Sequence, residues 1–241
     1  RNQGQLLQQL CTAEQYTEMH NFLSNTQRAK PSDLEGRSKI ATDLLNIADK
    51  KFEAGDMNNT IFFRIAGMHY LDFSQDDFSK LSLDEQRQVH HTLVTELRKL
   101  SVAMRNAKRV RQAITATDLA FDMLDDLSQE DGERLKIELF FNRALAKGVD
   151  RDFEGAREEA HEILRLSPEH AQAKQIIKNC RVAIRRERGP RDSRWTQPLD
   201  FVPEGDKEWF VMHFQVFSVV VAIIGILIVQ YARYYGFSSE E

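Results

Sequence analysis

The chain has few cysteines and carries none of the short motifs that mark common enzyme classes. Only Cys11 and Cys180 occur among its 241 residues, without a CxxC or Cys/His spacing, which argues against a disulfide framework or a zinc site. No Walker loop, GxGxxG, HExxH or GxSxG sequence is present. We therefore assign no catalytic, cofactor-binding or metal-binding residue and predict that the protein is not an enzyme.

Two polar pairs are better explained by ordinary helical structure than by chemistry. His90 and His91 are adjacent, and neighbouring helical side chains point about 100° apart, so they do not form one metal-binding face. Asp125 and Asp126 lie at the end of an expected helix, and we interpret them as a solvated helix end rather than as paired acid/base carboxylates.

The chain also lacks an excess of charge of either sign. Its 33 Lys and Arg residues stand against 37 Asp and Glu residues, which gives a formal net charge of −4. This balance gives no support to nucleic-acid binding, and no long acidic run suggests a solvating tail. We expect protein partners and membrane lipids, with no nucleic acid and no small-molecule substrate.

Proline is nearly absent from the central part of the chain, where apolar residues recur at helical spacing. Between residues 34 and 187 the only proline is Pro168. A stripe such as Leu93, Leu97, Leu100 and Met104 is typical of a helix that packs against other helices. The fold class is therefore predicted to be all-α. The expected helices span residues 3–27, 34–54, 57–72, 84–107, 111–127, 133–147, 153–166 and 169–187.

One long uncharged stretch near the C-terminus contrasts with the rest of the chain. Residues 209–232 contain no formal charge, and about 20 apolar residues suffice to cross a bilayer core. Trp209 and Phe210 at one end and Tyr234 and Tyr235 just beyond the other resemble the aromatic belts of spanning helices. The sequence thus predicts a single transmembrane helix, with a buried core helix as the alternative.

The predicted span divides the chain into five parts. We expect an N-terminal helical extension at 1–33, a repeat domain at 34–187, a basic, proline-containing linker at 188–208, the span at 209–232 and a short polar tail at 233–241. Basic residues gather before the span, so the repeat domain is expected on the positive side of the membrane, whether matrix, stromal or cytosolic. Those that could also contact anionic headgroups are Arg185, Arg186, Arg188, Arg191 and Arg194.

The helices are expected to form hairpins with small residues at equivalent positions. Short breaks at 55–56, 108–109 and 148–150 join helices in pairs, and Thr60, Ala113 and Ala156 then fall at matching places. Together with Ala160 and Pro168, this pattern resembles the tetratricopeptide repeat, a stacked helical hairpin. The spacings of 53 and 43 residues exceed the family period of about 34, which implies insertions between pairs.

Longer early repeats followed by an extended last helix resemble the repeat domain of large immunophilins and related co-chaperones. In that family, Lys, Asn and Arg residues of the repeat groove clamp the C-terminal carboxylate of cytosolic heat-shock chaperones. The corresponding positions here hold Leu45, Asp49, Lys99, Glu138 and Asn142. Because Asp49 and Glu138 would repel a carboxylate, the resemblance does not extend to that ligand.

Two function hypotheses follow from these features. The first is a non-enzymatic scaffold, an accessory subunit of an organelle membrane complex, with the mitochondrial inner membrane favoured and the thylakoid second. The first residue is Arg1 rather than Met, which is expected of a processed chain whose import signal has been removed, with a trimmed chain as the alternative. The alternative is a tail-anchored adaptor or co-chaperone on the endoplasmic reticulum or outer mitochondrial membrane.

Aromatic residues are the predicted partner contacts of the repeat domain. Adjacent helical residues cannot both face the same way, so at least one member of each pair is a candidate for an exposed contact. Burial of both members between neighbouring repeats is the alternative. The candidates are Phe62, Phe63, Phe73, Phe140 and Phe141.

Overall fold

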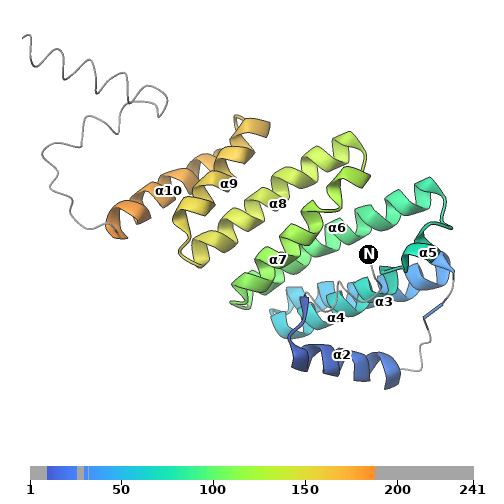
Figure 1. Ribbon diagram of the computed structural model, residues 1–241. Coiled ribbons are helices and arrows are strands. Elements are labelled where there is room, and N and C mark those ends of the chain that lie inside the picture. The colour runs from blue at the N-terminus through green and yellow to red at the C-terminus, as the bar shows by residue number, and fades with distance from the viewer. Residues whose placement is uncertain (1–9, 26–29, 32, 188–241) are drawn as a thin grey trace, which may run out of the picture. The chain divides into compact units, whose positions relative to one another are not determined.

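The described part of the chain is helical throughout. The computed structural model describes residues 10–25, 30–31 and 33–187, in which helices occur and strands do not (Figure 1). The all-α prediction is confirmed for these residues. The elements are α2 Ala13–Asn25, α3 Leu34–Glu53, α4 Met57–Leu71, α5 Gln75–Phe78, α6 Leu83–Asn106, α7 Val110–Phe121, the 3₁₀ turn η1 Leu124–Asp126, α8 Gln129–Val149, α9 Phe153–Leu166 and α10 Ala171–Glu187.

Side chains that precede the helices fix where several of them begin. Asp33 accepts a hydrogen bond of 2.7 Å from the backbone N–H of Gly36, and Asp152 accepts one of 2.9 Å from that of Gly155. Ser82 and Glu85 form a reciprocal capping box at the start of α6. Each such cap contributes about 1 kcal/mol. The predicted starts at 34 and 153 are correct because these signals are local.

The turns inside the three hairpins share one backbone conformation. Gly55, Lys108 and Arg151 have φ angles of 76°, 64° and 66°, the left-handed region that ends many helices. The backbone N–H of each donates to the carbonyl three residues before it. The backbone N–H of the next residue donates to the carbonyl five residues before that residue. These positions are 53 and 43 residues apart, the same spacing as that of Thr60, Ala113 and Ala156. The hairpins are therefore repeats of one structural unit.

These turns allow a matched stability test. A non-glycine residue in the left-handed region is strained, so Lys108→Gly and Arg151→Gly are each expected to raise the free energy of unfolding by about 0.5–1 kcal/mol. Gly55→Ala is expected to lower it by a similar amount, since a Cβ there would meet nothing within 4 Å and only the backbone is affected. Urea titrations of the variants measure this. Lys108→Ala, which keeps the Cβ, is the control, and a gain equal to that of Lys108→Gly would contradict the backbone explanation.

Close packing within each hairpin depends on the small residues. Thr60, Ala113 and Ala156 are all fully buried or nearly so. At Gly67 of α4, an added Cβ would lie 2.9 Å from the side chain of Leu45 and 3.2 Å from the carbonyl oxygen of Ala41. The pairs α3/α4, α6/α7 and α8/α9 then stack in chain order, and α10 packs on α9 (Figure 1).

The apolar core runs through the stack as two clusters. The larger one includes residues from α2 through α8, with Leu97, Leu100 and Met104 fully buried at its centre. The smaller one joins α8, α9 and α10 around Phe140 and Ile163. Helix α2 is part of this core, because Met19 is buried where α2 contacts α4.

Some predicted helix bounds were wrong. The first helix was expected to run unbroken from 3 to 27, but the chain breaks at Thr12, whose hydroxyl and backbone N–H pair with Gln15 and start α2. The helix expected at 111–127 ends at Phe121, and η1 follows as a separate turn. The connection expected at 74–83 contains the short helix α5, capped by Ser74.

No helix in the described ranges combines the length and apolar character needed to cross a bilayer. The span predicted at 209–232, the linker at 188–208 and the polar tail lie outside those ranges.

Candidate protein-interaction surface

The first helices of the three hairpins present neighbouring residues on one strip of surface. Asp49 on α3 lies 3.4 Å from the Lys99 ammonium on α6, and Arg98 on α6 lies 2.5 Å from Glu138 on α8. Residues three or four positions further along each helix share the same face. We call this set the first-helix strip. It comprises Asp49, Phe52, Arg98, Lys99, Val102, Glu138, Phe141, Leu145 and Val149.

A buried arginine lies beneath one end of the strip. Arg64 on α4 is 2% exposed and forms ion pairs with Glu96 of α6 and with Asp49, whose oxygen is 2.5 Å from the guanidinium. Lys99 completes the network at 3.1 Å from Glu96. A buried charge is tolerated only when it is paired, so this network fixes the first hairpin against the second.

The carboxylates of the strip are already paired within the chain. Burial tends to raise the pKa of Asp49, but the hydrogen bond and charge of Arg64 and the charge of Lys99 hold that pKa below its usual value. Glu138 pairs with Arg98 and, at 3.7 Å, with Arg134. These carboxylates therefore have cationic partners within the chain, rather than facing a ligand without one.

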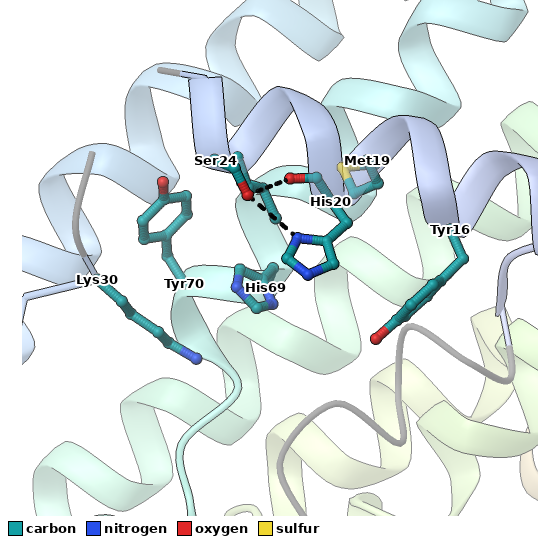
Figure 2. Close-up of a pocket in the computed structure, with 8 residues that line it drawn as sticks. Tyr16, Met19, His20, Ser24, Lys30, His69 and Tyr70 are labelled. Carbon is teal, nitrogen blue, oxygen red and sulfur yellow. Dashed lines mark hydrogen bonds between the residues drawn. The ribbon is translucent and has the colours of Figure 1, made fainter. Parts of the chain in front are cut away.

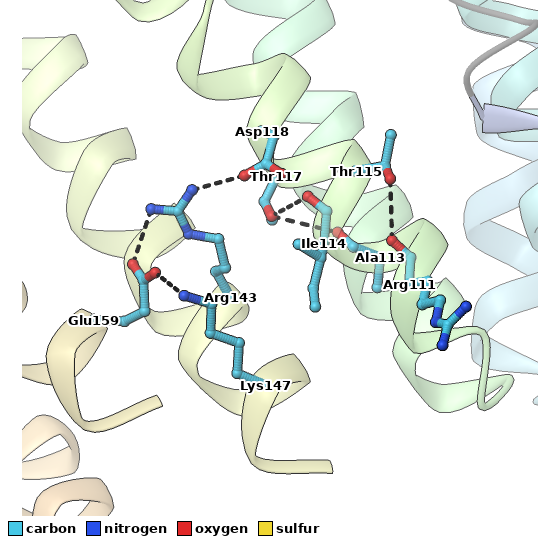
Figure 3. A network of polar contacts seen from close by, with 9 residues as sticks. All are labelled: Arg111, Ala113, Ile114, Thr115, Thr117, Asp118, Arg143, Lys147 and Glu159. Carbon is cyan, nitrogen blue, oxygen red and sulfur yellow. Dashed lines mark hydrogen bonds and ion pairs between the residues drawn. The ribbon is translucent and has the colours of Figure 1, made fainter. Parts of the chain in front are cut away.

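A second network ties the middle hairpin to the last (Figure 3). Arg143 on α8 donates to Asp118 of α7 at 2.7 Å and to Glu159 of α9 at 2.9 Å, and Lys147 reaches Glu159 at 2.6 Å. The Arg143 guanidinium also lies 4.4 Å from the ring centre of Phe121. One arginine thus holds three consecutive helices, so this network orients the last hairpin.

The positions that correspond to the chaperone clamp are brought into one region, but they do not form a carboxylate site. Leu45 is buried against Gly67, and its side chain has no polar group that could bind a carboxylate. Lys99 is the one lysine among these positions, and its ammonium is shared between Asp49 and Glu96. The expectation that the chaperone peptide does not bind stays a prediction.

Apolar side chains interrupt the charges of the strip. Phe52 is 36% exposed and Val149 is 48% exposed, and Val102, Phe141 and Leu145 between them are partly exposed. Paired charges around exposed apolar groups are a usual composition for a protein-binding surface.

The five predicted aromatic contacts have partners within the chain. Phe62 and Phe63 are partly buried, with ring centres 5.2 and 6.0 Å from Phe22 of α2. Phe73 is buried beneath the Arg37 guanidinium, and Phe140 is buried beside Phe121. Phe141, which is partly exposed on the strip, has its ring centre 5.9 Å from His170. Contact of these residues with another protein stays a prediction.

The predicted lipid-contacting residues are only partly described. Arg185 and Arg186 are exposed in the last turn of α10. Arg188, Arg191 and Arg194 lie outside the described residues. Contact of this basic group with headgroups stays a prediction.

Within the described ranges, no three His, Cys, Asp or Glu side chains gather as a metal site would require. His90 lies 3.2 Å from Asp126 and stacks on Phe78, while Cys11 and Cys180 are free thiols. Burial raises the pKa of Cys11 to about 11, which keeps that thiol protonated and poorly nucleophilic.

Sequence reasoning missed the buried residues of both networks. Arg64 and Glu96 are 32 residues apart, and no local pattern links them. Alignment of the hairpins could have identified Arg64. It occupies the position that the small buried residues Thr117 and Ala160 hold in the other two hairpins.

Comparison with solved structures supports the repeat fold. The chain resembles the C-terminal TPR-containing domain of a Plasmodium falciparum protein named as an FK506-binding protein, with a TM-score of 0.50 and 12% sequence identity. The match covers 68% of this chain and 97% of that domain. No protein-family model matches the sequence, and no curated protein is significantly similar to it. The tetratricopeptide-like fold is thus shown by structure alone.

Proposed function

We propose that this protein is a non-enzymatic interaction scaffold, an accessory subunit of an organelle membrane complex that binds other subunits through its repeat domain. The observation that carries the proposal is the first-helix strip, where partly exposed apolar residues lie among charges that are already paired internally. Such a surface can bury apolar area against a partner without leaving carboxylates unpaired. The mitochondrial inner membrane is the first proposed location, with the repeat domain on the matrix side.

Site-specific photo-crosslinking tests the proposed partner surface. A photoreactive phenylalanine placed at Phe52 or Val149 is expected to capture the same one or two membrane-complex proteins when the chain is expressed in its own cells. The matched control is Asp125, an exposed residue of η1, which should capture none of them. Equal products from Asp125 and Val149, or no product from either strip position, would reject the strip as the interface.

Anchoring by residues 209–232 is part of the proposal and has its own test. The uncharged stretch predicts that the full chain stays in the membrane pellet after carbonate extraction. A chain cut before Trp209 is expected in the supernatant with its helical circular dichroism retained. Recovery of the full-length chain from the supernatant without detergent would rule out the anchor.

A tail-anchored adaptor that recruits peptides is the second candidate. The exposure of Phe52 and Val149 at the ends of their helices favours it, because a short peptide can reach them along one face. A permanent subunit interface buries more than about 2,000 Å², whereas a recruited peptide buries much less. Detergent-solubilised complexes that survive dilution on native gels support the subunit, and loss of all partners on dilution supports the adaptor.

A further inference from the structure

A cavity between α2 and α4 lies outside the first-helix strip. Its volume is about 300 Å³, and it is lined by Tyr16, Met19, His20, Leu23, Ser24, Lys30, His69 and Tyr70 (Figure 2). The lining therefore combines apolar and aromatic groups with one amine, two imidazoles and several hydroxyls. None of the described residues that line the cavity carries a carboxylate.

The basic groups of the cavity converge from three segments. His20 belongs to α2, His69 to α4, and Lys30 precedes α3 (Figure 2). The Lys30 ammonium donates to the backbone carbonyl of Asp72 at 2.6 Å, which leaves two of its three N–H donors for other acceptors. The hydroxyl of Ser24 is 3.2 Å from Nδ1 of His20.

His69 carries a buried polar atom that the chain does not satisfy. Its Nδ1 is inaccessible to bulk solvent and has no hydrogen-bond partner. A buried polar group of this kind normally has a partner, which is either protein, ordered water or a ligand. Because the cavity has the volume of about ten water molecules, a small molecule can fit there and supply that partner.

The electrostatics of the cavity favour an anion. Burial and the charge of Arg37 lower the pKa of Lys30 to about 8, against the opposing charges of Asp72 and Asp77. Burial, with the charges of Lys30, Arg37 and His20, lowers the pKa of His69 to about 4. Near neutral pH, Lys30 is therefore mostly protonated while His69 is neutral. A bound carboxylate can pair with the Lys30 ammonium and accept a hydrogen bond from an N–H of the His69 imidazole. The apolar side chains of Met19 and Leu23 in the lining select against a fully hydrated inorganic ion.

We propose that the α2/α4 cavity is a binding site for a small carboxylate with an apolar body of about ten non-hydrogen atoms. The carboxylate accepts hydrogen bonds from the free N–H groups of Lys30 and interacts with His20 and His69. The apolar body contacts Met19, Leu23 and the ring of Tyr16. This site is distinct from the proposed partner surface, so its test is independent of the proposed function.

A titration of the full chain with phenylacetate, in mild detergent, tests the site. Binding is measured from the imidazole Cε1–Hε1 signals in NMR spectra. Phenylacetamide has the same shape without the charge, and inorganic phosphate has charge without the apolar body. Phenylacetate is expected to shift the His69 and His20 signals saturably, and both other probes to bind at least tenfold more weakly. This comparison uses the unaltered chain and does not depend on how well a variant folds.

Variants then locate the anion. Lys30→Met is expected to weaken phenylacetate binding at least tenfold, whereas Lys50→Met, which changes an exposed lysine of α3, should leave binding unchanged. Signals are assigned with His69→Gln and His20→Gln. The proposal is overturned if phenylacetate gives no saturable shift, if phenylacetamide or phosphate binds as tightly, or if Lys30→Met binds like the unaltered chain.

Discussion

Replacement of Arg64 by methionine is expected to lower the free energy of unfolding by about 3–5 kcal/mol. The guanidinium is buried, and its removal leaves Glu96, itself buried, with Lys99 as its remaining cationic partner. Methionine has similar length, so lost volume contributes little. Urea titrations followed by circular dichroism measure the change.

The double variant Arg64→Met with Glu96→Leu separates the two parts of this effect. Removal of both charges eliminates the buried carboxylate that has lost its guanidinium partner, so the double variant is expected to be more stable than Arg64→Met alone. Arg87→Met is the control, because Arg87 is largely exposed and its contact with Asp84 is 3.8 Å long. A loss below 1 kcal/mol in Arg64→Met would show that the network contributes little.

The second large expected effect is a loss of folding stability at acid pH. The folded-state pKa of His69 is about 4, against 6.5 for the free side chain, through burial and the nearby charges of Lys30, Arg37 and His20. Between these two values the unfolded chain binds a proton that the folded chain does not. Stability is therefore expected to fall as pH drops from about 6.5 to 4, by up to about 3 kcal/mol.

His69→Gln removes the titrating group, so its stability should change much less across that pH window. Asp49, Asp56, Asp77 and Glu85 have lowered pKa values and destabilise the fold only at still lower pH, which keeps the window specific. His161→Gln, at an exposed position of α9, is the matched control. Parallel curves for His69→Gln and the unaltered chain would contradict the assignment to His69.

The elements that could be predicted from the sequence are those with local causes. Asp33, Ser82 and Asp152 cap helices whose apolar stripes begin directly after the cap. Gly55 indicates a turn because glycine is the residue type that favours one. Lys108 and Arg151 adopt the same left-handed turn without a glycine, and only their alignment with Gly55 indicates it. The end of α7 was missed because the apolar pattern continues through Leu124, although that residue packs from the separate turn η1.

The site residues that the sequence could not predict depend on contacts between distant segments. At least one of the adjacent residues Phe62 and Phe63 is a candidate for an exposed contact by sequence, but Phe22 of α2 packs against both. Likewise His69 is unremarkable in sequence, and only the packing of α2 on α4 makes it part of a cavity. The energetics of Arg143 also require α7, α8 and α9 to be assembled before its partners meet.

The packing of α2 has a consequence for the order of folding. Most helices contact partners close to them in sequence, and contacts of this kind form quickly. The Gln112 side chain, by contrast, donates to the carbonyl of Leu10 at 3.1 Å across 102 residues. Closing so long a loop is entropically unfavourable until α4 and α7 are in place. The segment that contains Leu10 and α2 is therefore expected to reach its native position late, after the hairpins that follow it in the sequence.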